Sequence, residues 1–276
     1  MGVSNKRRSG LSGWLPPLVE QALRPYLGRG VYYRGNYPDW QSARLRSIGY
    51  DDAAIAQKTL ASARKVKAGE ARFERDSVLF DEPSYPFAVL ATLLRAAAEA
   101  GGQLAVLDFG GSLGSSYFQC LPFLAVIKSL QWGIVEQPHL VACGRAELED
   151  GNLRFFDSIA VCEQSIRPNV ALLSGVLQYV PDPCAILKEL ASCGIRYFVI
   201  DRTPFSALTV DKITVQYVPK SIYAASYPCR VFSRSTFLAH LPDDCEVLAE
   251  FDSDDGSAKV GVTSFTYGGM VLRRRD

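Results

Sequence analysis

The chain has 276 residues, a formal net charge of +1 and 48% hydrophobic residues, which is enough to bury the core of one large domain with a small appendage. The near-neutral charge argues against a polyanionic partner, so nucleic-acid binding is not expected, and the short basic tracts near the termini fit solvated tails. Seven cysteines without a C-x-x-C pair and only two histidines exclude the usual zinc patterns, predict no metal, and suit reduced thiols in a cytoplasmic protein.

Residues 1–80 are predicted to form a cap on a domain that spans 81–276. The stretch 11–27 has the pattern of a short amphipathic helix, which would dock on the chain's own core or touch a membrane surface peripherally. Residues 28–50 are rich in glycine and aromatics and are interpreted as cap, and 51–70 read as a polar, alanine-rich helix. No apolar run approaches the roughly 18 residues of a membrane span, and the N-terminus lacks the apolar core of a secretion signal.

A second helix is predicted from Pro86 to Ala100, where apolar residues recur at helical spacing and two glycines end the pattern. From there, short apolar runs alternate with helix-competent stretches. This alternation predicts an α/β fold with a parallel sheet and helices on both faces.

The most informative stretch is 105–117, AVLDFGGSLGSSY, in which a buried strand ends at an acidic residue and a glycine-rich turn follows before a helix. Gly110, Gly111 and Gly114 permit a tight turn and the close approach of a ligand to the backbone. In a dinucleotide site a carboxylate at this position would repel the pyrophosphate, so Asp108 favours a ligand that carries positive charge.

The second strand is predicted at Trp132–Glu136, after a helical stretch that Pro122 interrupts. Glu136 lies 22 positions after Gly114, close to the spacing at which a carboxylate at the end of the second strand accepts both ribose hydroxyls of an adenosine. An ordinary surface glutamate at a strand end is the competing interpretation.

Three further strands are predicted at 153–156, 170–174 and 197–200. The first is followed by Asp157, a candidate for holding an adenine amino group, and the second by the segment 175–183, GVLQYVPDP. Tyr179 in that segment would line a cationic group through its ring or pack under a helix start. The last strand delivers Asp201, with Arg202 and Thr203, to the carboxyl edge of the sheet, where open α/β folds bind ligands.

An aromatic and proline-rich insertion, 203–241, is interpreted as a lid over the substrate, although a structural excursion or a dimer contact would produce the same pattern. Two final strands at Cys245–Phe251 and Tyr267–Arg273 are predicted to form a hairpin around a polar loop, Asp252–Ser257.

The glycine loop resembles the first motif of the class I S-adenosylmethionine-dependent methyltransferases, with Ser112 in place of the usual middle glycine. The segment 177–183 is similar to one that follows the fourth strand in many of them, with Tyr179 in place of a histidine. Further strings, among them Glu74–Ser77 and 222–228, resemble an uncharacterised bacterial methyltransferase family that is associated with surface-polysaccharide gene sets.

The resemblance implies a Rossmann-like sheet of seven strands with an antiparallel last strand, and S-adenosylmethionine as cofactor. The expected cofactor contacts are Asp108, Gly110, Gly111, Gly114, Tyr117, Glu136, Gln137, Asp157, Ser174 and Gln178. The expected catalytic and positioning residues are Asp201, Asp76, Tyr179 and Tyr223, with one of the two aspartates as general base for a hydroxyl acceptor.

The resulting hypothesis is O-methylation of a small molecule, glycan or glycolipid by in-line displacement. A noncatalytic, methyltransferase-like binding module is the main alternative because of Ser112 and the missing histidine. An NAD-dependent oxidoreductase is disfavoured by Asp108 and by the final hairpin.

Overall fold

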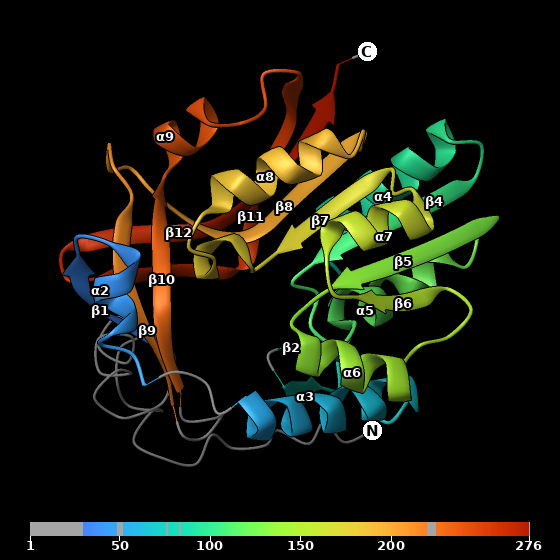
Figure 1. Cartoon of the computed structure of the whole chain (residues 1–276), viewed down its shortest axis with the longest axis horizontal. Helices are drawn as coiled ribbons and strands as arrows, with labels where there is room; N and C mark the ends of the chain where they lie inside the picture. Colours follow the sequence, from blue (N-terminus) through green and yellow to red (C-terminus); the bar gives the residue numbers. More distant parts are fainter. Residues whose placement is uncertain (1–29, 49–51, 76, 83, 220–224, 276) are drawn as a thin grey trace, which may run out of the picture.

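The computed structural model of the chain describes residues 30–48, 52–75, 77–82, 84–219 and 225–275. These residues form a ten-stranded mixed sheet with helices on both faces, and a separate two-stranded sheet (Figure 1). The amphipathic stretch 11–27 lies outside the described residues, and the division of the chain at residue 80 stays a prediction.

Seven of the ten strands form a Rossmann-like core. They lie in the order β6-β5-β4-β7-β8-β12-β11; the first five are mutually parallel, and β12 runs antiparallel to both of its neighbours. This order confirms the predicted sheet with its antiparallel last strand. The bounds are β4 Gln103–Phe109, β5 Ser129–Val135, β6 Leu153–Phe156, β7 Val170–Ser174, β8 Tyr197–Ser206, β11 Cys245–Val260 and β12 Thr263–Arg274.

Alternating apolar residues of the parallel strands supply both layers of the core, because successive side chains of a strand point to opposite faces. In β7, Val170 and Leu172 pack in one layer and Ala171 and Leu173 in the other. The first layer is covered by α3 Asp52–Lys67, α4 Phe87–Glu99, α5 Ser115–Leu124 and α6 Pro138–Glu147. The second, which faces the viewer in Figure 1, is covered by α7 Ile159–Ile166, α8 Pro183–Ser192 and α9 Arg234–Ala239.

Helices α3 and α4 confirm the two helices predicted ahead of the glycine loop. Pro122, however, does not interrupt the helix after that loop, because α5 continues past it to Leu124. Pro122 lies eight positions into the α5 helix, near its C-terminal end, where the helix stops two residues later.

The C-terminal hairpin is longer than predicted. Strands β11 and β12 stay paired out to Val260 and Thr263, so the stretch Asp252–Ser257 is not the hairpin loop but part of β11. A register shift between Asp252 and Ser257 marks an irregularity of the pairing there. The polar composition that suggested a loop reflects the exposure of this stretch at the edge of the sheet.

The region predicted as cap and lid contributes three strands to the sheet. Strand β1 (Tyr32–Tyr37) pairs with β9 (Lys212–Val218), which pairs with β10 (Ala225–Ser233), all antiparallel. Strand β10 joins the core sheet beside the last residues of β8, beyond the end of β7. The glycine-rich and aromatic stretch 28–50 therefore holds an unforeseen strand and the short helix α2 (Trp40–Arg44).

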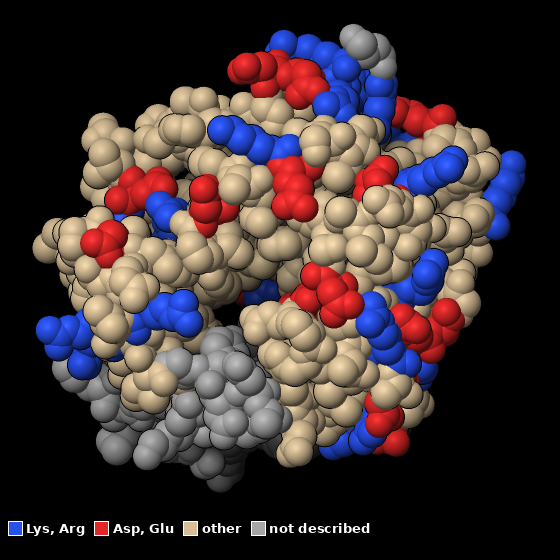
Figure 2. Space-filling view, in the orientation of Figure 1, with Lys and Arg blue, Asp and Glu red and all other residues tan. Residues whose placement is uncertain are grey.

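Three features of the described residues concern the surface charge, the helices and the cysteines. Acidic and basic side chains are interspersed over the face seen in Figure 2. No helix in the described part of the chain is both long and apolar enough to cross a membrane. All seven cysteines are free thiols.

Candidate functional site

The glycine loop between β4 and α5 lies at the carboxyl edge of the parallel strands. Gly110, Ser112 and Gly114 all have positive φ, at 71°, 53° and 95°. Ser112 thus adopts the left-handed conformation that a glycine would favour, at the modest cost that a residue with a Cβ pays there. The serine therefore leaves the course of the loop intact.

Close packing beneath the loop explains why it needs glycines. A Cβ on Gly110 would lie 2.3 Å from Cγ2 of Val176, and one on Gly111 would lie 2.5 Å from the carboxyl group of Asp108. Both distances are shorter than any real contact. The loop therefore packs against Val176, two residues after the end of β7, and against Asp108 near the end of β4.

Asp108 is buried under the loop, with 1% of its surface exposed. Nε1 of Trp132 donates a hydrogen bond to its Oδ2 at 3.1 Å. Burial raises the pKa of Asp108 to about 7, although the Trp132 bond opposes this rise. The carboxyl group therefore changes charge near neutral pH, and a bound cation would favour its ionised form.

Glu136 follows β5 directly and extends its carboxylate over the loop. Its Oε1 accepts from the backbone N–H of Ser112 at 3.3 Å, and its Oε2 accepts from that of Gln137 at 2.7 Å. Burial raises the pKa of Glu136, and the two backbone donors offset part of this rise. A carboxylate has about four acceptor sites, so both oxygens keep capacity for a further donor.

Asp201 sits in a bulge of β8. Gly268 and Met270 of β12 pair with Thr203 and Ile200, so Asp201 and Arg202 together oppose the single residue between them. Arg202 has φ of 52°, and bulges of this kind re-aim side chains beside functional sites. The strand continues beyond Ile200 to Ser206, which is farther than predicted.

Ser174, at the end of β7, is the neighbour of Asp201 across the two strands. Its hydroxyl donates to Oδ2 of Asp201 at 3.1 Å, and the backbone N–H of Arg202 donates to Oδ1 at 2.8 Å. Burial raises the pKa of Asp201, and the Arg202 charge and both hydrogen bonds oppose the rise. The geometry brings this predicted pair together at the edge of the sheet.

A cavity of about 30 Å³, the volume of a single water, opens beside Asp201. It lies on the side of the sheet that α4 and α5 cover. The cavity is lined by Glu74, Arg75, Pro86, Val89, Ser115, Ser116, Gln119, Ser174, Asp201 and Arg202. The start of α5 therefore links Asp201 to the glycine loop.

Two residues were missed as site candidates: Glu74, which lines this cavity, and Asp255, which contacts two residues of its lining. Glu74, in β2 (Phe73–Arg75), is 4% exposed and accepts hydrogen bonds from the hydroxyl of Ser115 and the backbone N–H of Ser77. Asp255 of β11 binds Nε of Arg202 at 2.8 Å and lies 3.5 Å from the guanidinium of Arg75. In the sequence, the string Glu74–Ser77 pointed to Glu74 through its resemblance to a methyltransferase family. Asp255 fell in the stretch Asp252–Ser257 that was predicted as the hairpin loop.

Gln178 and Tyr179 form a short 3-10 turn, Leu177–Tyr179, after β7. Gln178 is 1% exposed, its Nε2 donates to the carbonyl of Arg202 at 3.1 Å, and its Oε1 is a buried acceptor without a hydrogen-bond partner among the described residues. Tyr179 points instead toward β9 and β10. Its hydroxyl donates to Oε1 of Gln216 in β9 at 2.9 Å, and its ring meets that of Tyr227 in β10 edge-on at 5.1 Å.

The side chains of three predicted contacts make no hydrogen bond with the glycine loop in the described part of the chain. Tyr117 is buried in the core, and its hydroxyl donates to Asp150 at 3.2 Å. Asp157 is exposed and paired with Arg145 at 2.9 Å, and Gln137 is exposed at the start of α6. Asp76 and Tyr223 lie outside the described residues.

Comparisons with known proteins add structural likenesses only. No protein-family model matches the chain, and no curated protein does. The N-terminal domain of EvdMO1, in a crystal structure determined in the presence of SAH and D-fucose, matches with 16% identity and a TM-score of 0.46, covering 82% of this chain and 98% of that one.

Two further solved structures match at a similar level. An amino pentose methyltransferase of Micromonospora echinaspora, involved in calicheamicin biosynthesis, has 13% identity and a TM-score of 0.43 over 69% of this chain and 92% of its own. Magnesium protoporphyrin IX methyltransferase of Synechocystis PCC 6803 has 15% identity and a TM-score of 0.41 over 82% and 99%. The fold assignment rests on the strand order described above, and these low likenesses carry no argument about activity.

Proposed function

We propose that the protein is an S-adenosylmethionine-dependent methyltransferase acting on a hydroxyl group. The proposal rests on one juxtaposition at the carboxyl edge: the glycine loop with Glu136 on one side, and the Ser174–Asp201 pair on the ends of β7 and β8 on the other. The first could hold an adenosine and the second could act on an acceptor.

The charges and free hydrogen-bonding capacity of this edge suit S-adenosylmethionine. Glu136 would accept the two ribose hydroxyls, and its place after β5 is the basis for that role. Asp108 would favour the positive charge of the cofactor, whereas it would disfavour a pyrophosphate. Oε1 of Gln178, which has no hydrogen-bond partner in the described part of the chain, is an acceptor for an ammonium or hydroxyl donor.

Bound there, S-adenosylmethionine supplies an activated methyl group for in-line displacement. An attacking alcohol must lose its proton, and Asp201 is the general base that we assign, because its pKa is raised toward the range in which a carboxylate accepts protons effectively. Ser174 and the N–H of Arg202 would orient its carboxylate. Positioning of the acceptor would provide most of the acceleration.

The acceptor that we propose is a hydroxyl of a small molecule, glycan or glycolipid. The support is the resemblance of the chain to methyltransferases associated with surface-polysaccharide gene sets. Residues 203–241 remain the proposed acceptor-binding segment, in which the ring of Tyr227 of β10 meets that of Tyr179. Asp76 and Tyr223 stay candidates for acceptor contacts.

Isothermal titration calorimetry with S-adenosylmethionine, S-adenosylhomocysteine and NADH tests the proposal. We expect the first two to bind with a one-to-one stoichiometry and NADH not to bind. Binding of NADH alone would assign the site to a dinucleotide enzyme. Binding of none of the three would favour a noncatalytic module.

Two variants separate the ribose site from general effects of charge. Glu136→Gln removes the bidentate acceptor, and we expect S-adenosylhomocysteine to bind about tenfold more weakly or worse. Glu189 lies at an exposed position of α8, so the matched control Glu189→Gln should bind S-adenosylhomocysteine like the parent protein. Equal affinities of the two variants would remove Glu136 from the site. Incubation of cell extracts with methyl-labelled cofactor, followed by mass spectrometry, would identify the acceptor.

A further inference from the structure

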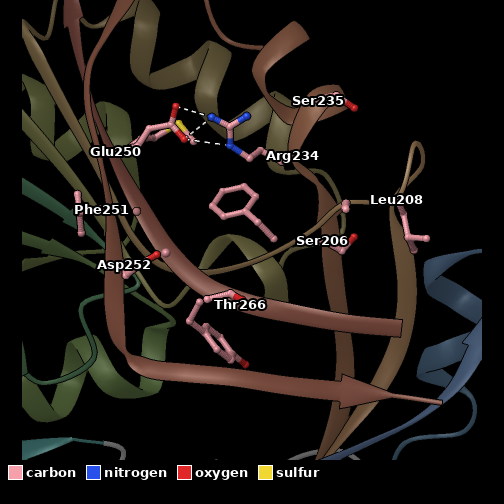
Figure 3. A pocket seen from close by; sticks show the side chains of 14 residues that line it. Ser206, Leu208, Arg234, Ser235, Glu250, Phe251, Asp252 and Thr266 are labelled. Atoms are coloured by element: carbon pink, nitrogen blue, oxygen red, sulfur yellow. Dashed lines mark hydrogen bonds and ion pairs between the residues drawn. The ribbon is translucent and has the colours of Figure 1, made fainter. Parts of the chain in front are cut away.

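A cleft of about 640 Å³ lies at the junction of β8, β11, β12 and the start of α9 (Figure 3). This volume is within the range of sites for small organic ligands. None of the residues assigned above to the cofactor or to proton transfer lines it. Six of its lining residues, Phe205 to Leu208 with Arg234 and Ser235, fall within the segment 203–241 that is proposed to bind the acceptor.

Strand register places its floor on one face of the sheet. Thr266, Gly268 and Met270 alternate along β12, and residues two apart in a strand share a face. Asp252 is directly opposite Gly268 in β11, and Phe205 is directly opposite Thr266 in β8. Side chains from three strands thus surround the position where Gly268 has none.

The cleft opens on the face opposite to the cavity beside Asp201. Met270 belongs to the core layer beneath α7, α8 and α9, and Phe205 packs against the same layer. The Asp201 cavity is lined by Val89 of α4 and Ser115 of α5, which belong to the other side of the sheet. A ligand in the cleft is consequently separated from the Asp201 cavity by the sheet itself.

The charges of the cleft leave one carboxylate uncompensated. Arg234 and Glu250 bind each other through Nε at 3.0 Å and through a second guanidinium nitrogen at 2.5 Å, as the dashed lines in Figure 3 show. This pair is neutral. Asp252 is exposed and lines the cleft, and its carboxylate makes no hydrogen bond or ion pair with any other described residue. The cleft therefore carries a net negative charge, which opposes anions and favours a cation.

The rest of the lining is apolar or weakly polar. Phe205 offers an aromatic ring, Met270 a polarisable sulfur at the floor, and Leu208 an aliphatic wall that is 38% exposed. A ligand with an apolar body and a positively charged amine would satisfy Asp252 and cover these groups together. A small inorganic cation would leave Phe205 and Leu208 partly exposed to water.

We infer that this cleft is a second binding site, separate from the methyl-transfer site, for a cyclic amine. The ammonium lies on Asp252, and the ring covers Phe205 and Leu208. Two sources share an ammonium and a ring that can cover Phe205: an amino sugar, through the C–H face of its ring, and an apolar cyclic amine. The inference does not depend on the proposed methyl transfer.

The test is a ¹H–¹⁵N NMR titration of the full chain with cyclohexylamine and, separately, with D-glucosamine. We expect saturable shifts at the amides of Gly268 and Gly269. Stronger binding of D-glucosamine identifies an amino sugar as the ligand class, and stronger binding of cyclohexylamine an apolar amine. Neutral cyclohexanol and D-glucose should bind at least tenfold more weakly than their amines, because they lack the charge that Asp252 would bind.

Two variants supply the controls. Asp252→Asn keeps the shape of the side chain and should weaken amine binding about tenfold, while Asp254→Asn, whose side chain lies near Ser84 outside the cleft, should not. Gly268→Ala adds a methyl group to the floor and should also weaken binding. The inference is overturned if neither amine gives saturable shifts, if the neutral analogues bind equally well, or if Asp252→Asn binds like the parent protein.

Discussion

Asp201 is the residue on which the proposed chemistry depends most. Its carboxyl group is 6% exposed, yet it borders a cavity and accepts two hydrogen bonds. Burial raises its pKa while Ser174 and Arg202 lower it, so its proton affinity is set by a balance of neighbours.

Replacing Asp201 by Asn should abolish methyl transfer while leaving cofactor affinity within about threefold, since the amide keeps the shape but cannot take a proton. Turnover with methyl-labelled cofactor and calorimetry with S-adenosylhomocysteine measure the two effects. Asp243→Asn, at an exposed position before β11, is the matched control. Turnover at the parental rate would exclude Asp201 as the base.

Ser174→Ala should shift the acidic limb of the pH–rate profile to higher pH. The Ser174 hydroxyl lowers the pKa of Asp201, so its loss leaves the carboxyl protonated over a wider range and the base inactive there. The profile of kcat against pH measures this shift. An unchanged limb together with a reduced kcat would mean that Ser174 only positions the acceptor.

Asp108 should make the stability of the protein fall with rising pH. Its pKa is raised from 3.8 to about 7, so the folded state holds a proton that the unfolded state releases. The associated stability is fully present below about pH 4 and is lost as pH rises through about 7, on the order of 4 kcal/mol at most.

Urea unfolding from pH 4 to 8 measures this effect against Asp108→Asn. The amide variant has no titrating group there and can still accept the Trp132 hydrogen bond. We expect the difference in unfolding free energy between the two proteins to change across this interval. A constant difference would show that Asp108 does not titrate near neutral pH.

At the scale of elements, the glycine loop is held in place by Val176, just after β7, as much as by its own sequence. Strand β7 is the neighbour of β4 in the sheet. Gly110→Ala would bring a methyl group against Val176 at a positive φ. We expect a loss of about 1 to 3 kcal/mol in stability and no detectable S-adenosylhomocysteine binding.

Thermal unfolding and calorimetry check this expectation, with Gly151→Ala as the control. A Cβ on Gly151 meets nothing within 4 Å, and its φ is not positive. Equal behaviour of the two variants would contradict the packing of Val176 on the loop.

At the scale of the whole molecule, the group of strands β1, β9 and β10 contacts the C-terminal hairpin of β11 and β12. The hydroxyl groups of Tyr33 in β1 and Tyr267 in β12 share a hydrogen bond across 234 positions of the chain, and both rings meet Phe265. Burial raises the pKa of Tyr33 well above its usual value, so the pair stays neutral. This contact fastens the first described strand to the last.

Tyr33→Phe should lower the unfolding free energy by about 1 kcal/mol, the usual contribution of a buried hydrogen bond. Tyr32→Phe keeps the stacking of that ring on Tyr217 and removes a hydroxyl that makes no hydrogen bond to any described residue, so it is the matched control. Chemical denaturation measures both variants. Equal destabilisation would mean that the Tyr33–Tyr267 bond contributes nothing specific.

The sequence by itself determined the parallel core, because buried strands, glycine turns and helix ends are encoded over short stretches of chain. Strands β6 and β7 have the predicted bounds, and Asp108, Glu136 and Ser174 lie at strand ends as expected. The aromatic stretch 28–50 and the insertion 203–241 carry no comparable local signal, since their strands form by pairing with each other and with the end of β8.

Only the tertiary structure decided how the site is assembled. The bulge that aims Asp201, the contact of Asp255 with Arg202 and the cleft at Asp252 all depend on register between β8, β11 and β12. Register between distant strands follows from packing over the whole sheet, and a shift of one residue would turn each side chain to the other face. A local sequence pattern predicts a strand, but it does not specify this register.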